Sequence, residues 1–125
     1  MSSGPEDAII GEFQRVLDDR FRLALPPEAA QFFGSDAADA VLVKERDRCL
    51  SLWKPIPAVP DAALLVSARY RRIQIGQRSR LLIPEGFREF LGVEANGEVA
   101  IVGAGVCVEI WHPAAWIEYL REDLE

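Results

Sequence analysis

The chain has 125 residues, 50% of them hydrophobic, and a formal net charge of −6. This size and composition allow one domain with a sizeable core and exclude a disordered chain. No apolar run approaches the ~20 residues that a membrane-spanning helix needs, and residues 1–7 carry acids where a signal peptide has basic residues. We therefore expect a cytoplasmic protein with no membrane partner, whose two cysteines stay reduced.

The charges are unevenly distributed along the chain. Residues 69–92 contain six arginines and two acids, whereas residues 13–34 contain three arginines and three acids. An acidic protein is a poor candidate for nucleic-acid binding, because phosphate contacts depend on clustered Lys and Arg. The basic stretch nevertheless keeps DNA as a candidate partner.

The first elements are predicted from alternation. Residues 1–10 show no periodicity and are expected to form a flexible tail. Residues 13–17 and 21–25 alternate apolar and polar side chains on either side of the turn Asp18-Asp19-Arg20, which predicts a β-hairpin. Counting at a period of two places Arg22 on the outer face, and Arg80 likewise in a later run.

A short helix, two buried strands and a final helix are predicted next. Pro26-Pro27-Glu28 suits the first turn of a helix that ends at Gly34. Continuous apolar runs at 40–43 and 99–102 predict strands covered on both sides, each leading to a last strand that ends in tryptophan. An amphipathic helix is predicted after Pro113 from the helical spacing of Trp116, Ile117, Leu120 and Leu124.

The chain repeats itself. Shifting residues 13–55 by 58 positions, with no gap, superposes them on residues 71–113. The shift aligns Arg20 with Arg78, Arg22 with Arg80, Cys49 with Cys107, Trp53 with Trp111 and Pro55 with Pro113. Such matches indicate a tandem duplication of a strand, strand, helix, strand, strand unit. Four short strands leave unpaired edges, whereas two copies can close a barrel.

The repeat predicts a division of one compact, mostly β domain with short helices. We expect a flexible tail (1–10), a first repeat (11–55), a linker (56–69), a second repeat (70–113) and a C-terminal helix (114–125). The stretch Pro57-Ala58-Val59-Pro60 matches a PxxP pattern, but a linker is favoured over a peptide ligand for another domain.

Three stretches carry a family resemblance. They are Gly11-Glu12-Phe13 leading into Leu17-Asp18-Asp19-Arg20-Phe21-Arg22-Leu23, the run Arg78-Ser79-Arg80-Leu81-Leu82-Ile83-Pro84 with Phe87-Arg88-Glu89, and Glu109-Ile110-Trp111 with Trp116. Together they resemble the MraZ family of bacterial regulators, within the AbrB/SpoVT superfamily of swapped-hairpin barrels. That family has Asp-x-x-x-Arg before a strand and a proline. It usually has glycine where this chain has Phe21 and Ser79, and a second Asp where this chain has Gly76.

The resemblance implies a pseudo-two-fold swapped-hairpin β-barrel and a sequence-specific DNA-binding transcriptional regulator of a division and cell-wall operon. It also implies homo-oligomers, in rings whose subunits contact promoter repeats, and a nucleoid-associated location. The expected partners are double-stranded DNA and further copies of the chain, with no cofactor and no small-molecule substrate.

Seven arginines on or beside the predicted hairpins are the candidate DNA contacts, since arginine suits bidentate contact with guanine or phosphate. They are Arg15, Arg20, Arg22, Arg71, Arg72, Arg78 and Arg80. The alternative is a solvated strand face in which Asp18 and Asp19 pair with Arg20 and Arg22.

The sequence supports other functions less well. An antitoxin-like or scaffold module that binds protein, with degenerate DNA binding, is the second hypothesis. Cys49, Cys107 and His112 lack the spacing of metal ligands, so no metal is expected. Gly103-x-Gly105 lacks the third glycine of a dinucleotide fingerprint and predicts a hairpin turn. No residues form a catalytic combination, so the chain is not expected to be an enzyme.

Overall fold

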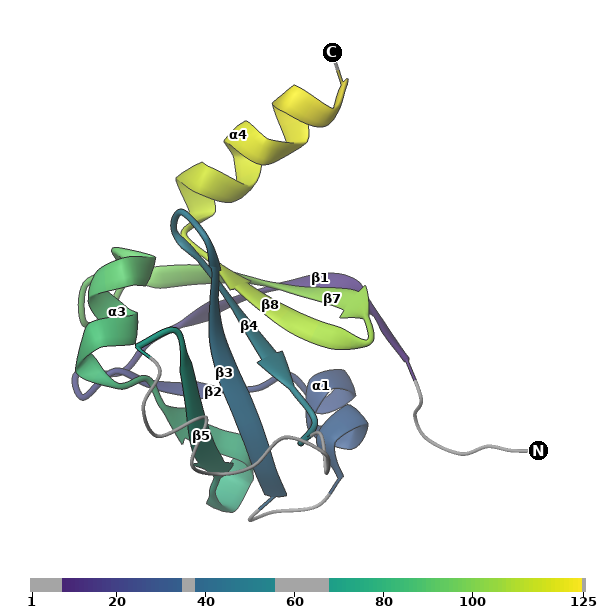
Figure 1. The fold of residues 1–125 in the computed structure, drawn as a ribbon, viewed down its shortest axis with the longest axis vertical. Helices are drawn as coiled ribbons and strands as arrows, with labels where there is room; N and C mark the ends of the chain where they lie inside the picture. Colours follow the sequence, from purple (N-terminus) through teal and green to yellow (C-terminus); the bar gives the residue numbers. More distant parts are fainter. Residues whose placement is uncertain (1–7, 35–37, 56–67, 125) are drawn as a thin grey trace.

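The computed structural model describes residues 8–34, 38–55 and 68–124 (Figure 1). Most of the predicted tail and most of the predicted linker therefore lie outside the described residues. The elements are β1 (Ile9–Val16), β2 (Arg22–Ala24), α1 (Pro27–Phe33), β3 (Ala38–Arg46), β4 (Cys49–Trp53), β5 (Tyr70–Ile75), the 3-10 turn η1 (Gln77–Ser79), β6 (Arg80–Leu82), α3 (Glu85–Leu91), β7 (Glu98–Gly105), β8 (Cys107–Trp111) and α4 (Pro113–Leu124). β1 thus begins two residues before the predicted start of the first repeat.

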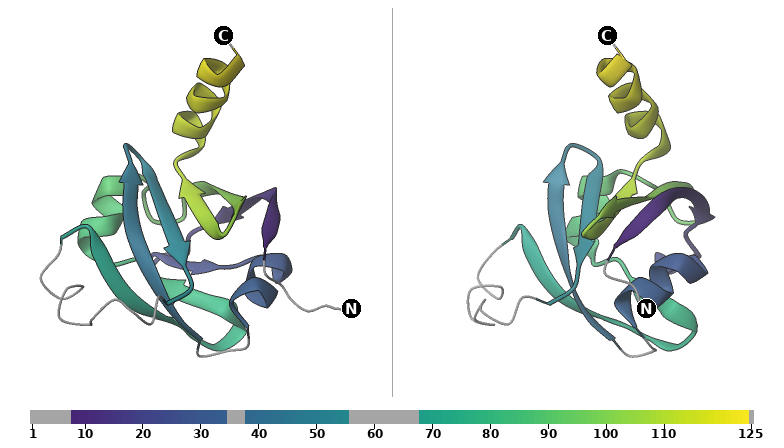
Figure 2. Two further views of the ribbon diagram at one scale, coloured as in Figure 1. Left: turned by 45° about the vertical axis from the view of Figure 1, so that its right-hand side comes forward. Right: turned by 90° about the vertical axis from the view of Figure 1, so that its right-hand side faces the viewer.

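The two repeats exchange their first strands. β1 pairs with β7 of the second repeat, and β5 pairs with β3 of the first repeat, both antiparallel. With β8 and β4 between these pairs, the six-stranded sheet has the order β1-β7-β8-β4-β3-β5. β2 and β6 form a separate two-stranded ribbon, and the curved sheet wraps the core together with this ribbon (Figures 1 and 2). This mostly β, pseudo-two-fold barrel confirms the predicted fold class.

The pseudo-two-fold axis passes through two strand pairs. In the β2–β6 ribbon, Leu23 pairs with Leu81, its counterpart in the other repeat. In the β4–β8 pair, Ser51 pairs with its counterpart Glu109. Both pairs are antiparallel, so equivalent residues of the two repeats face each other only at these central positions.

The predicted hairpin over residues 13–25 does not form. β1 and β2 follow each other in the chain, but each pairs with a strand of the other repeat. Asp18 redirects the chain here, because its Oδ1 accepts the N–H groups of Arg20 and Arg22, both at 2.8 Å. The alternation correctly predicted which side chains are buried, but it carries no information on which strand is the partner.

The ungapped alignment of the repeats is wrong for one stretch of β3. In β7 the core residues are Val99 and Ile101, whereas in β3 they are Ala40 and Leu42, one position earlier than the 58-residue shift gives. A register shift in β3 between Lys44 and Arg46 accounts for the difference. A bulge adds one residue to a strand and so moves the preceding residues to the opposite face.

The two short helices each follow a strand of the ribbon and pack on the core. α1 begins at Pro27, as predicted, and buries Ala29 and Phe32 in the core. It is followed by Gly34 at φ +105°, a conformation that favours glycine. α3 buries Phe87 and Leu91 in the same core. Both helices have seven residues, too few to be stable alone, so their packing on the strands stabilises them.

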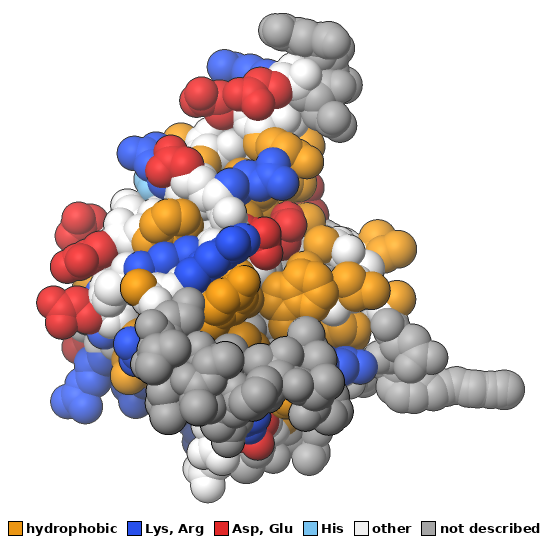
Figure 3. Space-filling model, viewed as in Figure 1, with side chains coloured by type: hydrophobic (Ala, Val, Ile, Leu, Met, Phe, Trp, Pro, Cys, Tyr) orange, Lys and Arg blue, Asp and Glu red, His pale blue; other side chains and the backbone are white. Residues whose placement is uncertain are grey.

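α4 docks through its first two turns on the outer face of the sheet. Trp111 is 2% exposed, and its ring lies 5.2 Å from Trp116 and 5.1 Å from Tyr119. Trp116 Nε1 donates a hydrogen bond to Glu12 Oε2 at 2.9 Å. The rest of α4 extends away from the barrel, with acidic and basic side chains interspersed along it (Figures 1 and 3). Among the described residues, no helix combines the length and the apolar character needed to cross a membrane.

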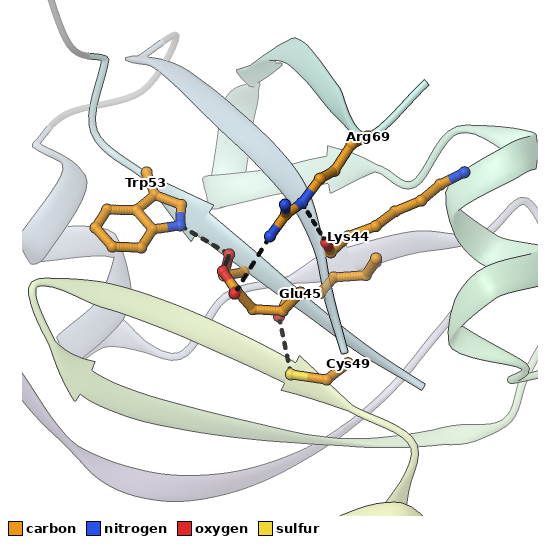
Figure 4. A network of polar contacts seen from close by, with 7 residues as sticks. Lys44, Glu45, Cys49, Trp53 and Arg69 are labelled. Carbon is orange, nitrogen blue, oxygen red and sulfur yellow. Dashed lines mark hydrogen bonds and ion pairs between the residues drawn. The ribbon is translucent and has the colours of Figure 1, made fainter. Parts of the chain in front are cut away.

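A polar network on the outer face ties β4, β3 and the start of β5 together (Figure 4). Ser51 is fully buried, and its Oγ donates to Glu45 Oε2 at 2.6 Å. Trp53 Nε1 donates to Ser51 Oγ at 2.7 Å. Arg69 donates from Nε to Lys44 O at 3.0 Å, and its Nη2 lies 3.9 Å from Glu45 Oε1. The buried hydroxyl of Ser51 thus forms hydrogen bonds with two groups at once, the Glu45 carboxylate and the Trp53 N–H.

We expect Ser51→Ala to lower the free energy of unfolding by about 1–3 kcal/mol, because the Trp53 N–H and the Glu45 carboxylate would each lose a partner. Urea denaturation followed by tryptophan fluorescence measures this loss. In a double-mutant cycle, Ser51→Ala combined with Trp53→Phe should cost less than the sum of the single variants. A loss for Ser51→Ala below about 0.5 kcal/mol, the size of an ordinary surface change, would contradict the prediction.

Candidate nucleic-acid interface

The β2–β6 ribbon turns two arginines outward. Leu23 and Leu81 are buried in the core at 0% and 2% exposure, so the alternate residues face away from the core. The register pairs Arg22 with Leu82 and Ala24 with Arg80. Because equivalent residues run in opposite directions, the two arginines lie diagonally on one face, on either side of the pseudo-two-fold axis.

A loop carrying a further arginine lies at each end of the ribbon. Arg20 is exposed in the loop before β2, and Arg78 is exposed in η1 before β6. Each loop is tied to the opposite strand by a backbone hydrogen bond. Ile83 N–H donates to Phe21 O, and Leu25 N–H donates to Ser79 O, both at 3.0 Å. The ladder of the ribbon therefore continues into both loops and holds them in related positions.

The residue before each motif arginine has a left-handed backbone. Phe21 has φ 61° and Ser79 has φ 55°. Glycine, which the family resemblance leads us to expect at both positions, is the residue that tolerates this conformation best. The guanidinium carbon of Arg88 lies 4.1 Å from the centre of the Phe21 ring, and Arg88 Nε donates to Ile83 O at 3.2 Å. Arg88 therefore connects α3 of the second repeat to the loop of the first.

The two loops differ in their acidic residues. Asp18 Oδ2 accepts a 2.8 Å hydrogen bond from Arg22 Nε, forming an ion pair in which the Arg22 side chain is 40% exposed. The N–H of Arg22 is the main cause that lowers the pKa of Asp18, and the N–H of Arg20 and the Arg22 guanidinium add to it. Gly76 takes the place of Asp18 in the second loop, and within the described part of the chain Arg80 forms no ion pair.

The structure brings only four of the seven predicted arginines to the ribbon. Arg15 lies on β1, half-buried, and donates from Nη1 to Gln14 O at 2.8 Å. Arg71 and Arg72 lie near the start of β5, with three to four residues of strand between them and η1. Arg71 is 5.7 Å from the Phe87 ring, and Arg72 Nη1 is 3.6 Å from Asp39 Oδ2.

Sequence reasoning missed Arg88. It lies in the basic stretch and in the family motif, but as a helix residue it was not placed beside a hairpin. Its neighbour Phe21 belongs to the other repeat, so no local pattern connects the two. Only the exchange of strands, which brings α3 next to the first loop, makes the contact.

Cys49, Cys107 and His112 lie in environments typical of structural residues and not of metal ligands. Cys49 and Cys107 are free and buried, and burial raises the pKa of both thiols, that of Cys107 to about 11. His112 Nδ1 accepts the N–H of Ala114 at 3.1 Å at the start of α4, and partial burial lowers its pKa. Among the residues with described positions, no group of three or more His, Cys, Asp and Glu could hold a metal.

The fold and the ribbon define a tandem-repeat, swapped-hairpin barrel with arginines on either side of its pseudo-two-fold axis. A family model described as "MraZ protein, putative antitoxin-like" matches residues 71–125. Proteins named "Transcriptional regulator MraZ" are similar over nearly the whole chain. The one from Thermomicrobium roseum is 32% identical, with 86% of this chain and 83% of that protein covered. Those from Kocuria rhizophila and Thermus thermophilus are 31% and 30% identical, covering 90% and 91% of this chain and 87% and 88% of those proteins.

The chain belongs to the MraZ family. The relatives are named as transcriptional regulators and not as enzymes, which agrees with the expectation from the sequence. Among solved structures, the solution structure of PHS018 from Pyrococcus horikoshii is more distantly similar, with 14% identity, a TM-score of 0.42, and 86% of this chain and 98% of that chain covered.

We expect Ser79→Gly to raise the free energy of unfolding by up to about 1 kcal/mol, because glycine adopts the left-handed conformation without strain. Phe21→Gly is the matched variant in the other repeat. It should lower stability, since it also removes an aromatic ring that packs against the core and Arg88. Urea denaturation of both variants provides the comparison, and a destabilised Ser79→Gly would contradict this account of the loop.

We expect neither cysteine to react with Ellman's reagent in the folded protein at pH 8. Both thiols are buried, and their raised pKa values leave little thiolate, the reactive form. In guanidinium chloride, two thiols per chain should react within minutes. Rapid modification of either cysteine without denaturant would show that the β4–β8 surface opens far more readily than its burial indicates.

Proposed function

We propose that the protein is a sequence-specific transcriptional regulator that binds double-stranded DNA through the β2–β6 ribbon and its end loops. The observation that carries this proposal is the outward placement of Arg22 and Arg80 on one ribbon face. Arg20 and Arg78 extend the same arrangement at the two ends. The names of the family's members, transcriptional regulators, support a DNA partner.

The shape of the ribbon suits the major groove of DNA. That groove admits a two-stranded β-ribbon, and arginine is the side chain best suited to pair with guanine or to contact phosphate. Arg22 and Arg80 are related by the pseudo-two-fold axis, and the DNA backbone also has local two-fold symmetry. A ribbon centred on Leu23 and Leu81 could therefore place one arginine near each strand of the duplex.

Useful affinity requires several copies of the chain. One barrel offers four arginines at the ribbon, and the chain as a whole carries a net charge of −6. Linked subunits convert later contacts into intramolecular ones and multiply the affinity. We accordingly propose a homo-oligomer, in a ring, whose two-repeat subunits contact successive promoter repeats of a division and cell-wall operon in the nucleoid.

A second candidate function rests on α4. Ile117 is 52% exposed and Leu120 is 38% exposed on this helix, which extends from the barrel. Exposed apolar residues on a projecting helix suit a protein partner, as an antitoxin-like or scaffold module would need. This function predicts a stable copurifying protein that Ile117→Ser releases, with DNA binding weak or lost.

The DNA-binding proposal is tested by fluorescence anisotropy with a duplex from the promoter region of the protein's own operon. With about four phosphate contacts for each bound subunit, affinity should fall at least about 100-fold between 50 and 200 mM salt, and more steeply when several subunits bind one duplex. Arg80→Gln should weaken binding and flatten this dependence. Arg121→Gln, the same charge change on exposed α4, is the control and should leave the salt dependence unchanged. Failure of the intact oligomer to bind the duplex at 50 mM salt would end the proposal.

A further inference from the structure

We infer that the two ends of the ribbon have different roles on DNA: the Arg22 end reads bases with an oriented, charge-compensated arginine, and the Arg80 end holds phosphates with an uncompensated one. This inference rests on the proposed DNA binding. It goes further by assigning sequence discrimination to one repeat and most of the electrostatic attraction to the other.

The two ends share several backbone features, although Arg78 in the second loop has φ 60° and its counterpart Arg20 has no positive φ. The differences that matter for contact with DNA lie in the side chains. Asp18 N–H donates to Arg22 O at 3.1 Å, and in the second loop Gly76 N–H donates to Arg80 O at 2.8 Å. The residue before each motif arginine has a positive φ in both loops. Each arginine also begins the three-residue strand that forms the ribbon.

The first loop compensates its arginines. Asp18, Asp19, Arg20 and Arg22 sum to zero charge, whereas Gly76, Gln77, Arg78 and Arg80 sum to +2. Asp18 also accepts the backbone N–H groups of Arg20 and Arg22, so its carboxylate is held in place. An arginine already paired with a fixed carboxylate releases few further counterions when it meets a phosphate.

The ion pair also orients Arg22. Asp18 engages the guanidinium through Nε at 2.8 Å. The two Nη groups form no hydrogen bond or ion pair within the part of the chain that the structure describes, and the side chain is 40% exposed. Bidentate reading of guanine needs two parallel N–H donors at a fixed angle, which the Nη groups of a held guanidinium can supply. Arg80 has no such support and suits the less directional contact with phosphate.

The missing carboxylate can be restored without disturbing the second loop. Gly76 has φ −83°, which any residue adopts. A Cβ built there meets only Arg80 O, at 3.6 Å, an ordinary van der Waals contact. Gly76→Asp therefore places a carboxylate at the position that corresponds to Asp18, and Gly76→Asn is its uncharged control.

The experiment measures anisotropy with two duplexes, the promoter duplex and a scrambled duplex of equal length and composition, at several salt concentrations from 50 to 200 mM. Gly76→Asp should weaken binding to both duplexes equally and reduce the salt slope by about 1 for each contacting subunit. Gly76→Asn should leave the slope as in the wild type. Asp18→Asn keeps an oxygen acceptor for the loop N–H groups but frees Arg22. It should therefore steepen the slope by about 1 for each contacting subunit and reduce the preference for the promoter duplex at least fivefold.

The outcomes separate this inference from the function on which it rests. A wild-type protein that binds neither duplex at 50 mM salt overturns the proposed function and the inference together. A wild type that prefers the promoter duplex, with an unchanged slope in Gly76→Asp and an unchanged preference in Asp18→Asn, overturns the inference alone. Circular dichroism confirms that each variant is folded. If Asp18→Asn fails to fold, the comparison of Gly76→Asp with Gly76→Asn decides.

Discussion

The exchange of strands between the repeats is the constraint on which the rest of the structure depends. Each repeat gives its first strand to the sheet of the other, and β2 and β6 contribute three residues each to the ribbon between them. A pair of three-residue strands is unstable alone, so the burial of Leu23 and Leu81 against both halves of the core must stabilise it. Neither repeat can bury its apolar side chains without the other. Closure of the barrel and formation of the ribbon therefore depend on each other.

The same exchange determines how the candidate interface is arranged. Because β2 and β6 run antiparallel through the pseudo-two-fold axis, the loops that precede them are carried to opposite ends of one ribbon. Arg88 then reaches the loop of the other repeat and packs against Phe21, a contact with no counterpart where Ala30 occupies the matched position. A duplication that would otherwise produce two identical sites thus produces one surface with two distinguishable ends.

Much of the fold could be predicted from the sequence because the pattern of neighbouring residues determines which side chains are buried and which local conformation they adopt. Alternation correctly predicted the inward-facing Leu23 and Leu81, and prolines and a glycine marked the bounds of α1. Strand partners were not predictable in the same way, because a hairpin and an exchanged pair present the same alternation. The bulge after Lys44 turns Ala40 and Leu42 toward the core, and the ungapped alignment of the two repeats gives no sign of it. Phe21 has a positive φ, which a residue with a bulky side chain rarely adopts, so its sequence did not predict this conformation. The candidate site depends on these non-local features, so four of the seven arginines came together and three did not.

The net charge of −6 is compatible with the proposed function because electrostatic interactions between exposed charges fade over about 10 Å at moderate salt. A phosphate near the ribbon responds mainly to the charges of the two loops, and only distantly to the acids of α4. A regulator must discriminate its operator from a large excess of other DNA, and non-specific binding comes almost wholly from uncompensated positive charge. On the proposed function, the ion pair with Asp18 neutralises the charge of Arg22 and so lowers the non-specific affinity for DNA. It also holds the guanidinium in one orientation, so that Arg22 can still read a base. The Asp18–Arg22 pair, which as a surface salt bridge contributes little to stability, would then matter chiefly for discrimination.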